Sequence, residues 1–210
     1  MPPNHKAKLH PLTGTQPQVF RLRIELDGTT PLVWRRIEVL ASATFWDLHM
    51  AIQNAFGWLD EHTHEFEVGP LTIGVPDAYG ASDTVPGWTA PLSKHLGQAR
   101  TVAYVYDFGD DWRHTIHREA IVDADGKPYP RCLAGENATP PENCGGVRGF
   151  EDLKEVLTRP KTAKYREMRD WLKNSHAKVY WPFDPLAFEH SKVVFRDPAQ
   201  GLQEMLGQQS

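Results

Sequence analysis

The segment from Thr101 to Val122 constrains the fold most, because it predicts two antiparallel strands joined by a short turn. Aromatic and β-branched residues, which favour strands, recur in TVAYVYDF and again in WRHTIHREAIV, and Gly109-Asp110-Asp111 separates the two runs. With the turn centred on Asp110, Asp107 faces Arg113, and the usual interpretation of that pair is a cross-strand ion pair. One face of the hairpin then carries Tyr104, Tyr106, Phe108, Trp112, His114 and Ile116.

The chain before this hairpin predicts a β-β-α start. In VFRLRIELD, which begins at Val19, apolar side chains occupy every second position, as in a strand with one buried face. Leu32–Leu40 predicts a second strand that pairs with the first. A helix follows, with Thr44 as its N-cap and Gly57 as the residue that ends it. Such a start favours an α+β fold in which helices pack on one side of a sheet.

Weaker signals supply the remaining elements. Strand patterns recur at His62–Val68 and Leu71–Val75, and short helices are expected near Phe150–Thr158 and Ala163–Asn174. The stretch between Asp123 and Gly149 is rich in Pro and Gly and predicts an irregular loop.

The length of 210 residues fits one sizeable core. We expect a flexible N-terminal tail at residues 1–17, a single α+β domain at 18–198 and a C-terminal tail at 199–210. No apolar run approaches the roughly 20 residues that span a bilayer, so no membrane segment is expected. Two cysteines and no apolar leader predict a cytoplasmic protein.

The net charge of −4 gives no global positive field that would attract a phosphate backbone. It weighs against a dedicated nucleic-acid binder, although a local basic face stays compatible with it. The first hairpin carries a basic cluster of Arg21, Arg23, Arg35 and Arg36. Arg21 and Arg23 share its polar face with Glu25 and Asp27, and the usual interpretation is a solvated surface. An unidentified protein is therefore the expected partner.

Histidines offer the first candidate site. His62 and His64 are two residues apart, so on one strand they share a face and can converge on one ion. His49 lies at the flank of the apolar stripe of the first helix. Together with His114 these residues are the candidate ligands of a zinc or acid–base site, while unrelated core and edge histidines are the more common outcome. His114 and His117 are three apart and fall on opposite faces of an unbulged strand.

Cys132 and Cys144 are further candidate metal ligands, although eleven residues separate them and no CxxC motif is present. Two cysteines cannot complete a structural zinc site without histidines. The alternative is two reduced thiols packed under a loop.

Asp107, Asp110 and Asp111, with His114, are the candidate catalytic residues of an acid–base enzyme. Turn and ion-pair roles are the commoner ones for such aspartates. Tyr106 and Trp112 are the candidate binding residues, because a partner could use an aromatic-rich sheet face. The chain shows no Gly-rich phosphate loop, GxSxG or HExxH motif.

Five segments in order resemble the plasmid pRiA4b ORF-3-like family over roughly residues 18–190. They are FRLRIELDGTTPLVWRRIEV, TFWDLHMAIQNAFGWLDEHTHEFEVG, YDFGDDWRHTI, CLAGENATPPENCGGVRGFEDL and FDPLAFE. The resemblance implies a large mixed, mainly antiparallel β-sheet with flanking helices, and an association with plasmids and transposable elements. It implies no particular reaction. The family loop often has a further cysteine where this chain has Thr139, which puts metal binding by the cysteines in doubt here.

Two functions follow as hypotheses. The favoured one is a non-enzymatic binding or accessory module of a mobile element, since the distinctive residues are aromatic, Gly and Pro rather than an assembled catalytic set. The alternative is a metal-dependent, zinc-type or acid–base hydrolytic enzyme built on the histidine and aspartate cluster.

Overall fold

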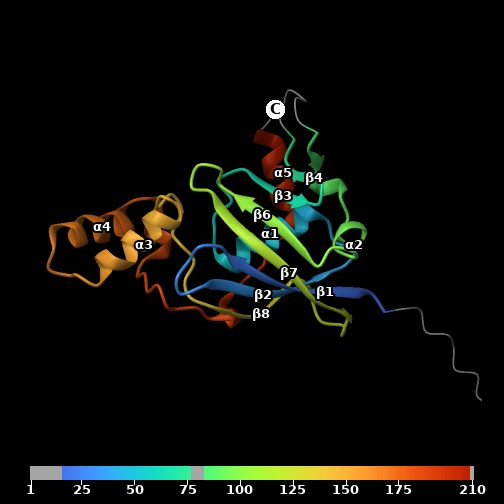
Figure 1. Cartoon of the computed structure of the whole chain (residues 1–210), viewed down its shortest axis with the longest axis horizontal. Helices are drawn as coiled ribbons and strands as arrows, with labels where there is room; N and C mark the ends of the chain where they lie inside the picture. The colour runs from blue at the N-terminus through green and yellow to red at the C-terminus, as the bar shows by residue number, and fades with distance from the viewer. Residues whose placement is uncertain (1–15, 77–82, 209–210) are drawn as a thin grey trace, which may run out of the picture.

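A computed structural model describes residues 16–76 and 83–208 and places one eight-stranded sheet at their centre (Figure 1). The strand order is β5-β4-β3-β6-β7-β1-β2-β8, and every pairing is antiparallel except that of β4 with β5. The strands are β1 (Gln18–Leu26), β2 (Val33–Leu40), β3 (His64–Val68), β4 (Leu71–Gly74), β5 (Val85–Pro86), β6 (Thr101–Tyr106), β7 (Trp112–Asp123) and β8 (Arg131–Glu136).

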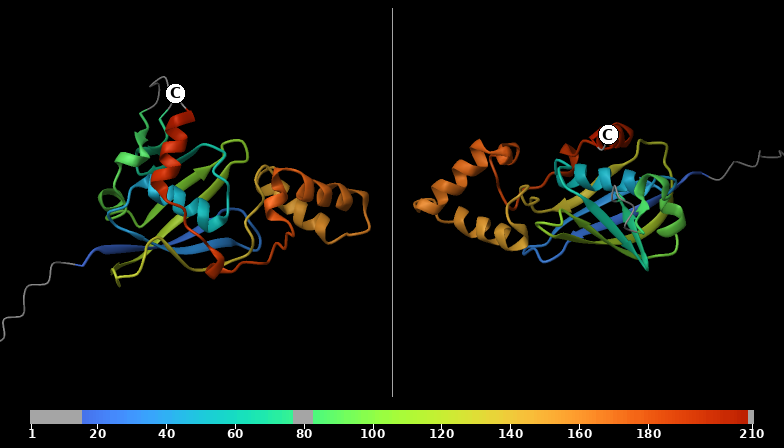
Figure 2. Two further views of the ribbon diagram at one scale, coloured as in Figure 1. Left: turned by 180° about the vertical axis from the view of Figure 1, so that it is seen from behind. Right: turned by 90° about the horizontal axis from the view of Figure 1, so that it is seen from above.

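Helices lie against one face of the sheet and beyond one end of it (Figures 1 and 2). The α-helices are α1 (Phe45–Phe56), α2 (Leu92–His95), α3 (Gly146–Leu157), α4 (Ala163–Asn174) and α5 (Pro198–Gln208). Three short 3₁₀ helices are η1 (Gly87–Thr89), η2 (His176–Tyr180) and η3 (His190–Lys192). No helix in the described ranges has the length and apolar character needed to cross a membrane.

The predicted fold class is confirmed, since the chain starts β-β-α and forms a mixed, mostly antiparallel sheet with flanking helices. The alternation in β1 buries Phe20, Leu22, Ile24 and Leu26 against the core. Burying each such side chain stabilises the fold by about 1.5–3 kcal/mol before entropy is counted.

Helix α1 covers the central strands and is delimited by the residues that the sequence indicates. The Thr44 hydroxyl accepts a hydrogen bond from the Asp47 amide, and the Asp47 carboxylate accepts one from the Thr44 amide, which completes a capping box. Gly57 ends the helix with φ 77°, in the left-handed region that glycine adopts without strain. Ten of the twelve residues of α1 are buried, so this helix forms the second layer of the core.

Strand β8 and helix α5 are among the elements that differ from the predicted ones. Strand β8 runs through the segment expected to be an irregular loop, because it adds to the edge of β2 by backbone pairing and needs no strong alternation of its own. Residues 199–208, expected as a tail, form most of α5, whose Gly201 lies against Met50 of α1. The predicted N-terminal tail lies outside the described residues except for its last two positions.

The hairpin of β6 and β7 keeps its predicted face but not its predicted register. Tyr106 pairs with Trp112, and Val105 rather than Asp107 faces Arg113, so the predicted Asp107–Arg113 ion pair is wrong. The reason is a longer turn: Asp107 and Asp111 both take positive φ, of 55° and 53°, and leave the strands. Arg113 instead pairs with Asp111. Phe108, predicted to share a strand face with Tyr106, lies instead in this turn and is 54% exposed.

Candidate metal centre

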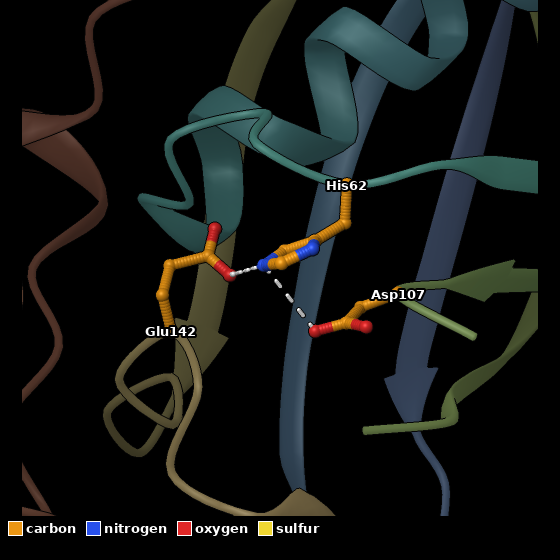
Figure 3. Close-up of side chains that lie close together, drawn as sticks. All are labelled: His62, Asp107 and Glu142. Atoms are coloured by element: carbon orange, nitrogen blue, oxygen red, sulfur yellow. Dashed lines mark ion pairs between the residues drawn. The ribbon is translucent and has the colours of Figure 1, made fainter. Parts of the chain in front are cut away.

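Three loops bring His62, Asp107 and Glu142 together at one end of the sheet (Figure 3). His62 lies in the connection from α1 to β3, Asp107 follows the last residue of β6, and Glu142 lies in the loop from β8 to α3. One potential ligand atom from each residue lies within 4.8 Å of the other two. Residues far apart in the sequence therefore meet because β6 sits next to β3 and the β8–α3 loop crosses the same end of the sheet.

The distances fit a small coordination site. His62 Nε2 lies 3.5 Å from Asp107 Oδ2 and 3.9 Å from Glu142 Oε2. Around a tetrahedral ion with bonds of about 2.0–2.2 Å, neighbouring ligand atoms lie about 3.3–3.6 Å apart. The His62–Asp107 distance lies in this range, and the His62–Glu142 distance exceeds it by a few tenths of an ångström.

Asp107 is fixed by its own turn. Its backbone amide donates to the carbonyl of Thr63, the residue after His62, at 2.9 Å. Its Oδ1 accepts hydrogen bonds from the amides of Gly109 and Asp110, as in an Asx turn. These contacts occupy Oδ1, and the other oxygen, Oδ2, is the one that faces His62.

The Glu142 carboxylate resembles that of Asp107, because one of its oxygens accepts hydrogen bonds from the protein and the other accepts none. Oε1 accepts hydrogen bonds from the Tyr106 hydroxyl at 2.9 Å and from the Leu59 amide at 3.0 Å. Oε2 is buried and has no hydrogen-bond partner, and the whole side chain is 0% exposed. Burial raises the pKa of this carboxyl above its ordinary value, because the ionised form loses its hydration and is destabilised in the buried position.

His62 completes the site from its more open side. Its side chain is 28% exposed, yet Nε2 itself is buried and makes no hydrogen bond. The ring packs edge-on against Tyr106, with centroids 5.9 Å apart. Two buried atoms without partners, His62 Nε2 and Glu142 Oε2, thus face each other beside the Asp107 carboxylate. Such atoms in a native structure call for a water or an ion.

The donor set defines the chemistry available. One imidazole nitrogen and two carboxylate oxygens suit zinc and other divalent transition-metal ions, and carboxylates alone would favour magnesium or calcium. The hydrogen bonds to Asp107 Oδ1 and Glu142 Oε1 orient the two carboxylates, a role that outer partners commonly have around bound metals.

The remaining candidate histidines lie elsewhere in the core. His49 and His64 stack on each other, with ring centroids 3.4 Å apart and planes inclined by 7°. His49 also contacts the Tyr104 hydroxyl at 2.9 Å and Asp60 at 2.7 Å. His62 precedes β3 and does not share a strand face with His64, because the strand begins only at His64. His114 is buried between Phe56 and Trp58, in edge-to-face contact with both.

The other candidate residues have structural surroundings. Asp110 accepts a hydrogen bond from the Gly145 amide, and Asp111 pairs with Arg113. Tyr106 and Trp112 are 0% exposed, so in this structure neither can contact a partner directly. Of the predicted aromatic binding residues, Tyr106 contributes to the site through its hydroxyl, which donates to Glu142, and through its ring, against which His62 packs.

Cys132 and Cys144 are free thiols, and neither belongs to the cluster of His62, Asp107 and Glu142. Burial raises the pKa of both thiols, which disfavours the thiolate that a metal requires. Thr139, at the position where the family loop often has a cysteine, accepts a hydrogen bond from the buried Arg35 at 2.9 Å. In this chain that position therefore links the loop to the core.

Sequence reasoning missed Glu142. The residue lies in PPENCGG, within the loop whose candidate metal ligands in the sequence are the two cysteines. A signal did exist: His62, Asp107 and Glu142 each fall in a different one of the segments that resemble the family. Spacing along the chain gives no indication that the three loops meet.

Comparisons with known proteins support the family resemblance carried by these segments. The pattern of the plasmid pRiA4b ORF-3-like family matches residues 18–192. Uncharacterized protein y4hQ from Sinorhizobium fredii is 31% identical over 159 residues, which are 75% of this chain and 82% of that protein. The crystal structure of MM3350, a protein of unknown function from Methanosarcina mazei Go1, superposes with a TM-score of 0.75 at 36% identity, covering 86% of this chain and 100% of that one. The chain belongs to the plasmid pRiA4b ORF-3-like family.

Proposed function

We propose that this domain binds one divalent transition-metal ion, of the zinc type, through His62 Nε2, Asp107 Oδ2 and Glu142 Oε2. The observation that carries the proposal is the pair of buried atoms without partners, His62 Nε2 and Glu142 Oε2, which lie 3.9 Å apart beside a second carboxylate. A cation between them satisfies both atoms and offsets the cost of burying the Glu142 charge.

Metal content and titration test this proposal. Protein purified without chelator is analysed by elemental mass spectrometry, and chelator-treated protein is titrated calorimetrically with zinc and with manganese. We expect one ion per chain, and a loss of at least about 100-fold in affinity when a ligand is removed. Protein that carries no metal and gives no binding heat up to millimolar zinc or manganese would contradict the proposal.

Isosteric variants keep the fold while removing the ligand atom. Asp107→Asn retains an oxygen for the Gly109 and Asp110 amides and tolerates the positive φ of this position. Glu142→Gln retains an oxygen for Tyr106 and Leu59. His117→Gln is the matched control, because His117 lies on β7 with a side chain 41% exposed and outside the cluster.

Metal-dependent hydrolysis is the second candidate function, and the number of protein ligands favours it. Structural zinc sites have four protein ligands, whereas three leave a position for water, whose pKa the ion lowers to about 7. His62 also lines a cavity of about 550 Å³ together with Asp60 and Arg196, which offers room for a small substrate next to the centre. In this proposal His62, Asp107 and Glu142 hold the ion, and no residue is assigned a proton transfer.

Hydrolysis is tested with p-nitrophenyl acetate and bis(p-nitrophenyl) phosphate on zinc-loaded protein. We expect turnover that follows metal content and disappears in Glu142→Gln. An ion that raises the melting temperature without supporting turnover would contradict hydrolysis. That outcome would support a non-enzymatic binding or accessory module whose fold the metal stabilises.

A further inference from the structure

One helical segment of this chain has a net positive charge, and the rest of the chain has a net negative charge. Residues 159–178, which contain α4, hold seven Lys and Arg against two Asp and Glu, a net charge of +5. The remainder holds 16 basic and 25 acidic residues, a net charge of −9. The overall charge of −4 therefore conceals a strongly basic segment.

Three of these cations form a row on one side of α4. Arg166, Arg169 and Lys173 follow the spacing i, i+3, i+7, which places side chains on the same face of a helix. We call these three residues the basic stripe. It is about 10 Å long, at a rise of 1.5 Å per residue. Leu172, the buried residue of α4, lies about 90° around the helix from the middle of this stripe at about 100° per residue, so the stripe flanks the buried side of the helix.

The cations of the segment are largely available to a ligand. Lys161, Lys164, Arg166, Lys173 and Lys178 are exposed, and none of them has an acidic partner within 4 Å in the part of the chain that the structure describes. Arg169 pairs with its neighbour Asp170, and both side chains remain at least 36% exposed. The positive charges of the five exposed residues are thus not neutralised by an ion pair in the described part of the chain, and Arg169 shares its charge with Asp170 while staying accessible to solvent.

The segment also stands away from the negative body of the molecule. Helices α3 and α4 lie side by side beyond one end of the sheet, as all three views show (Figures 1 and 2). An aromatic ring accompanies the stripe: Lys173 Nζ lies 4.7 Å from the ring of Trp181, which is 37% exposed. A cation next to an accessible aromatic ring can hold a phosphate while the ring stacks on a base.

We propose that the basic stripe, with Lys161 and Lys178 near its ends, binds the phosphate backbone of nucleic acid. The net charge of −9 elsewhere repels a polyanion, so contact is confined to the α4 side of the protein. Repeated phosphates match a row of cations along a helix. Binding depends on salt, because each phosphate contact releases a counterion.

Fluorescence anisotropy with a labelled oligonucleotide tests the proposal on the full chain. The probes are a single strand and a duplex of about 20 nucleotides, at 50 mM and at 150 mM NaCl. The test variant is Arg166→Gln/Arg169→Gln/Lys173→Gln, since Gln retains helix propensity. We expect its affinity to fall at least about 10-fold, and the slope of log K against log salt to flatten by about 2–3.

The matched control is Lys94→Gln/Lys127→Gln/Lys192→Gln, which removes the same charge from exposed positions outside the segment. We expect it to bind as the wild type does. Circular dichroism establishes that both variants are folded, and chelator should not change the affinity, because the stripe contains none of the proposed metal ligands.

Three results would overturn the proposal. One is wild-type protein that binds neither probe at 50 mM salt. Another is an equal loss of affinity in the control variant. The third is equally tight binding of polyglutamate, which would assign the stripe to an acidic protein partner instead.

Discussion

The Tyr106 hydroxyl donates a hydrogen bond of 2.9 Å to Glu142 Oε1 and accepts one of 3.1 Å from the Glu61 amide. Burial raises the pKa of Tyr106 above its ordinary value, so the hydroxyl keeps its proton and acts as the donor. A residue of β6 thereby joins the loop that carries His62 to the loop that carries Glu142. Through this side chain the sheet links the two loops that carry His62 and Glu142, whereas Asp107 is held by its own turn.

Replacing this hydroxyl should weaken metal binding without abolishing it. In Tyr106→Phe, Glu142 keeps its hydrogen bond from Leu59 but loses the one that orients Oε1. We expect zinc affinity to fall by about 10–100-fold. Tyr104→Phe is the control, because it removes a buried hydroxyl that contacts His49 and Gln53 instead. Calorimetric titration that gives equal affinities for the two variants would contradict this role of Tyr106.

Glu142→Gln should have opposite effects on the metal-free and metal-loaded protein. Without an ion, the variant removes a buried charge whose Oε2 has no partner, so the free energy of unfolding should rise by about 1–2 kcal/mol. With saturating zinc, the wild type should gain stability that the variant lacks. Thermal melts with and without zinc measure both effects. A metal-free variant less stable than the metal-free wild type would refute the prediction.

The fold follows from local patterns because each of them corresponds to one physical preference. Alternation along β1 places one face in the core, and the Thr44 capping box and Gly57 delimit α1. Strand β8 was missed because edge pairing depends on the backbone of β2 and not on the side chains of β8. Helix α5 was missed because its contact with α1 is tertiary.

The sequence predicts the candidate site only in part, because the site also depends on contacts between segments that are distant in the sequence. The sequence indicates His62 and Asp107 as site residues but predicts contacts that they do not make. It predicts an ion pair between Asp107 and Arg113, and a shared strand face for His62 and His64. The turn that places Asp107 at positive φ depends on its own side chain accepting two amide hydrogen bonds. Glu142 joins them only through the path of a long loop, which no spacing in the sequence records.

His114 should make the fold sensitive to acid. Burial lowers the pKa of His114 to about 3, below the value of about 6.5 in an unfolded chain. Between these values the unfolded state binds a proton that the folded state does not, so stability is lost as the pH falls from 6.5 towards 3, by about 1.4 kcal/mol per pH unit. Urea unfolding at several pH values should show a shallower loss for His114→Leu. His117→Leu, at an exposed position, is the control, and equal pH slopes for His114→Leu and wild type would contradict the prediction.

Arg35 should be essential to stability even though no carboxylate pairs with it in the described ranges. It is 1% exposed and donates to the carbonyls of Trp34, Ala55 and Glu136 and to the Thr139 hydroxyl, while its guanidinium lies 3.6 Å from the Phe188 ring. Burial lowers its pKa to about 9, so it stays charged at neutral pH.

Arg35→Met fills much of the same space but leaves these four acceptors without their donor. We therefore expect the free energy of unfolding to fall by about 3 kcal/mol or more, measured by urea denaturation. Arg113→Met, at a side chain 57% exposed, should change it by less than about 0.5 kcal/mol. Equal stability of the two variants would contradict this prediction. It would mean that the hydrogen bonds of Arg35 do not hold β2, α1 and the β8–α3 loop together, and that packing alone accounts for its contacts with Phe188 and Thr139.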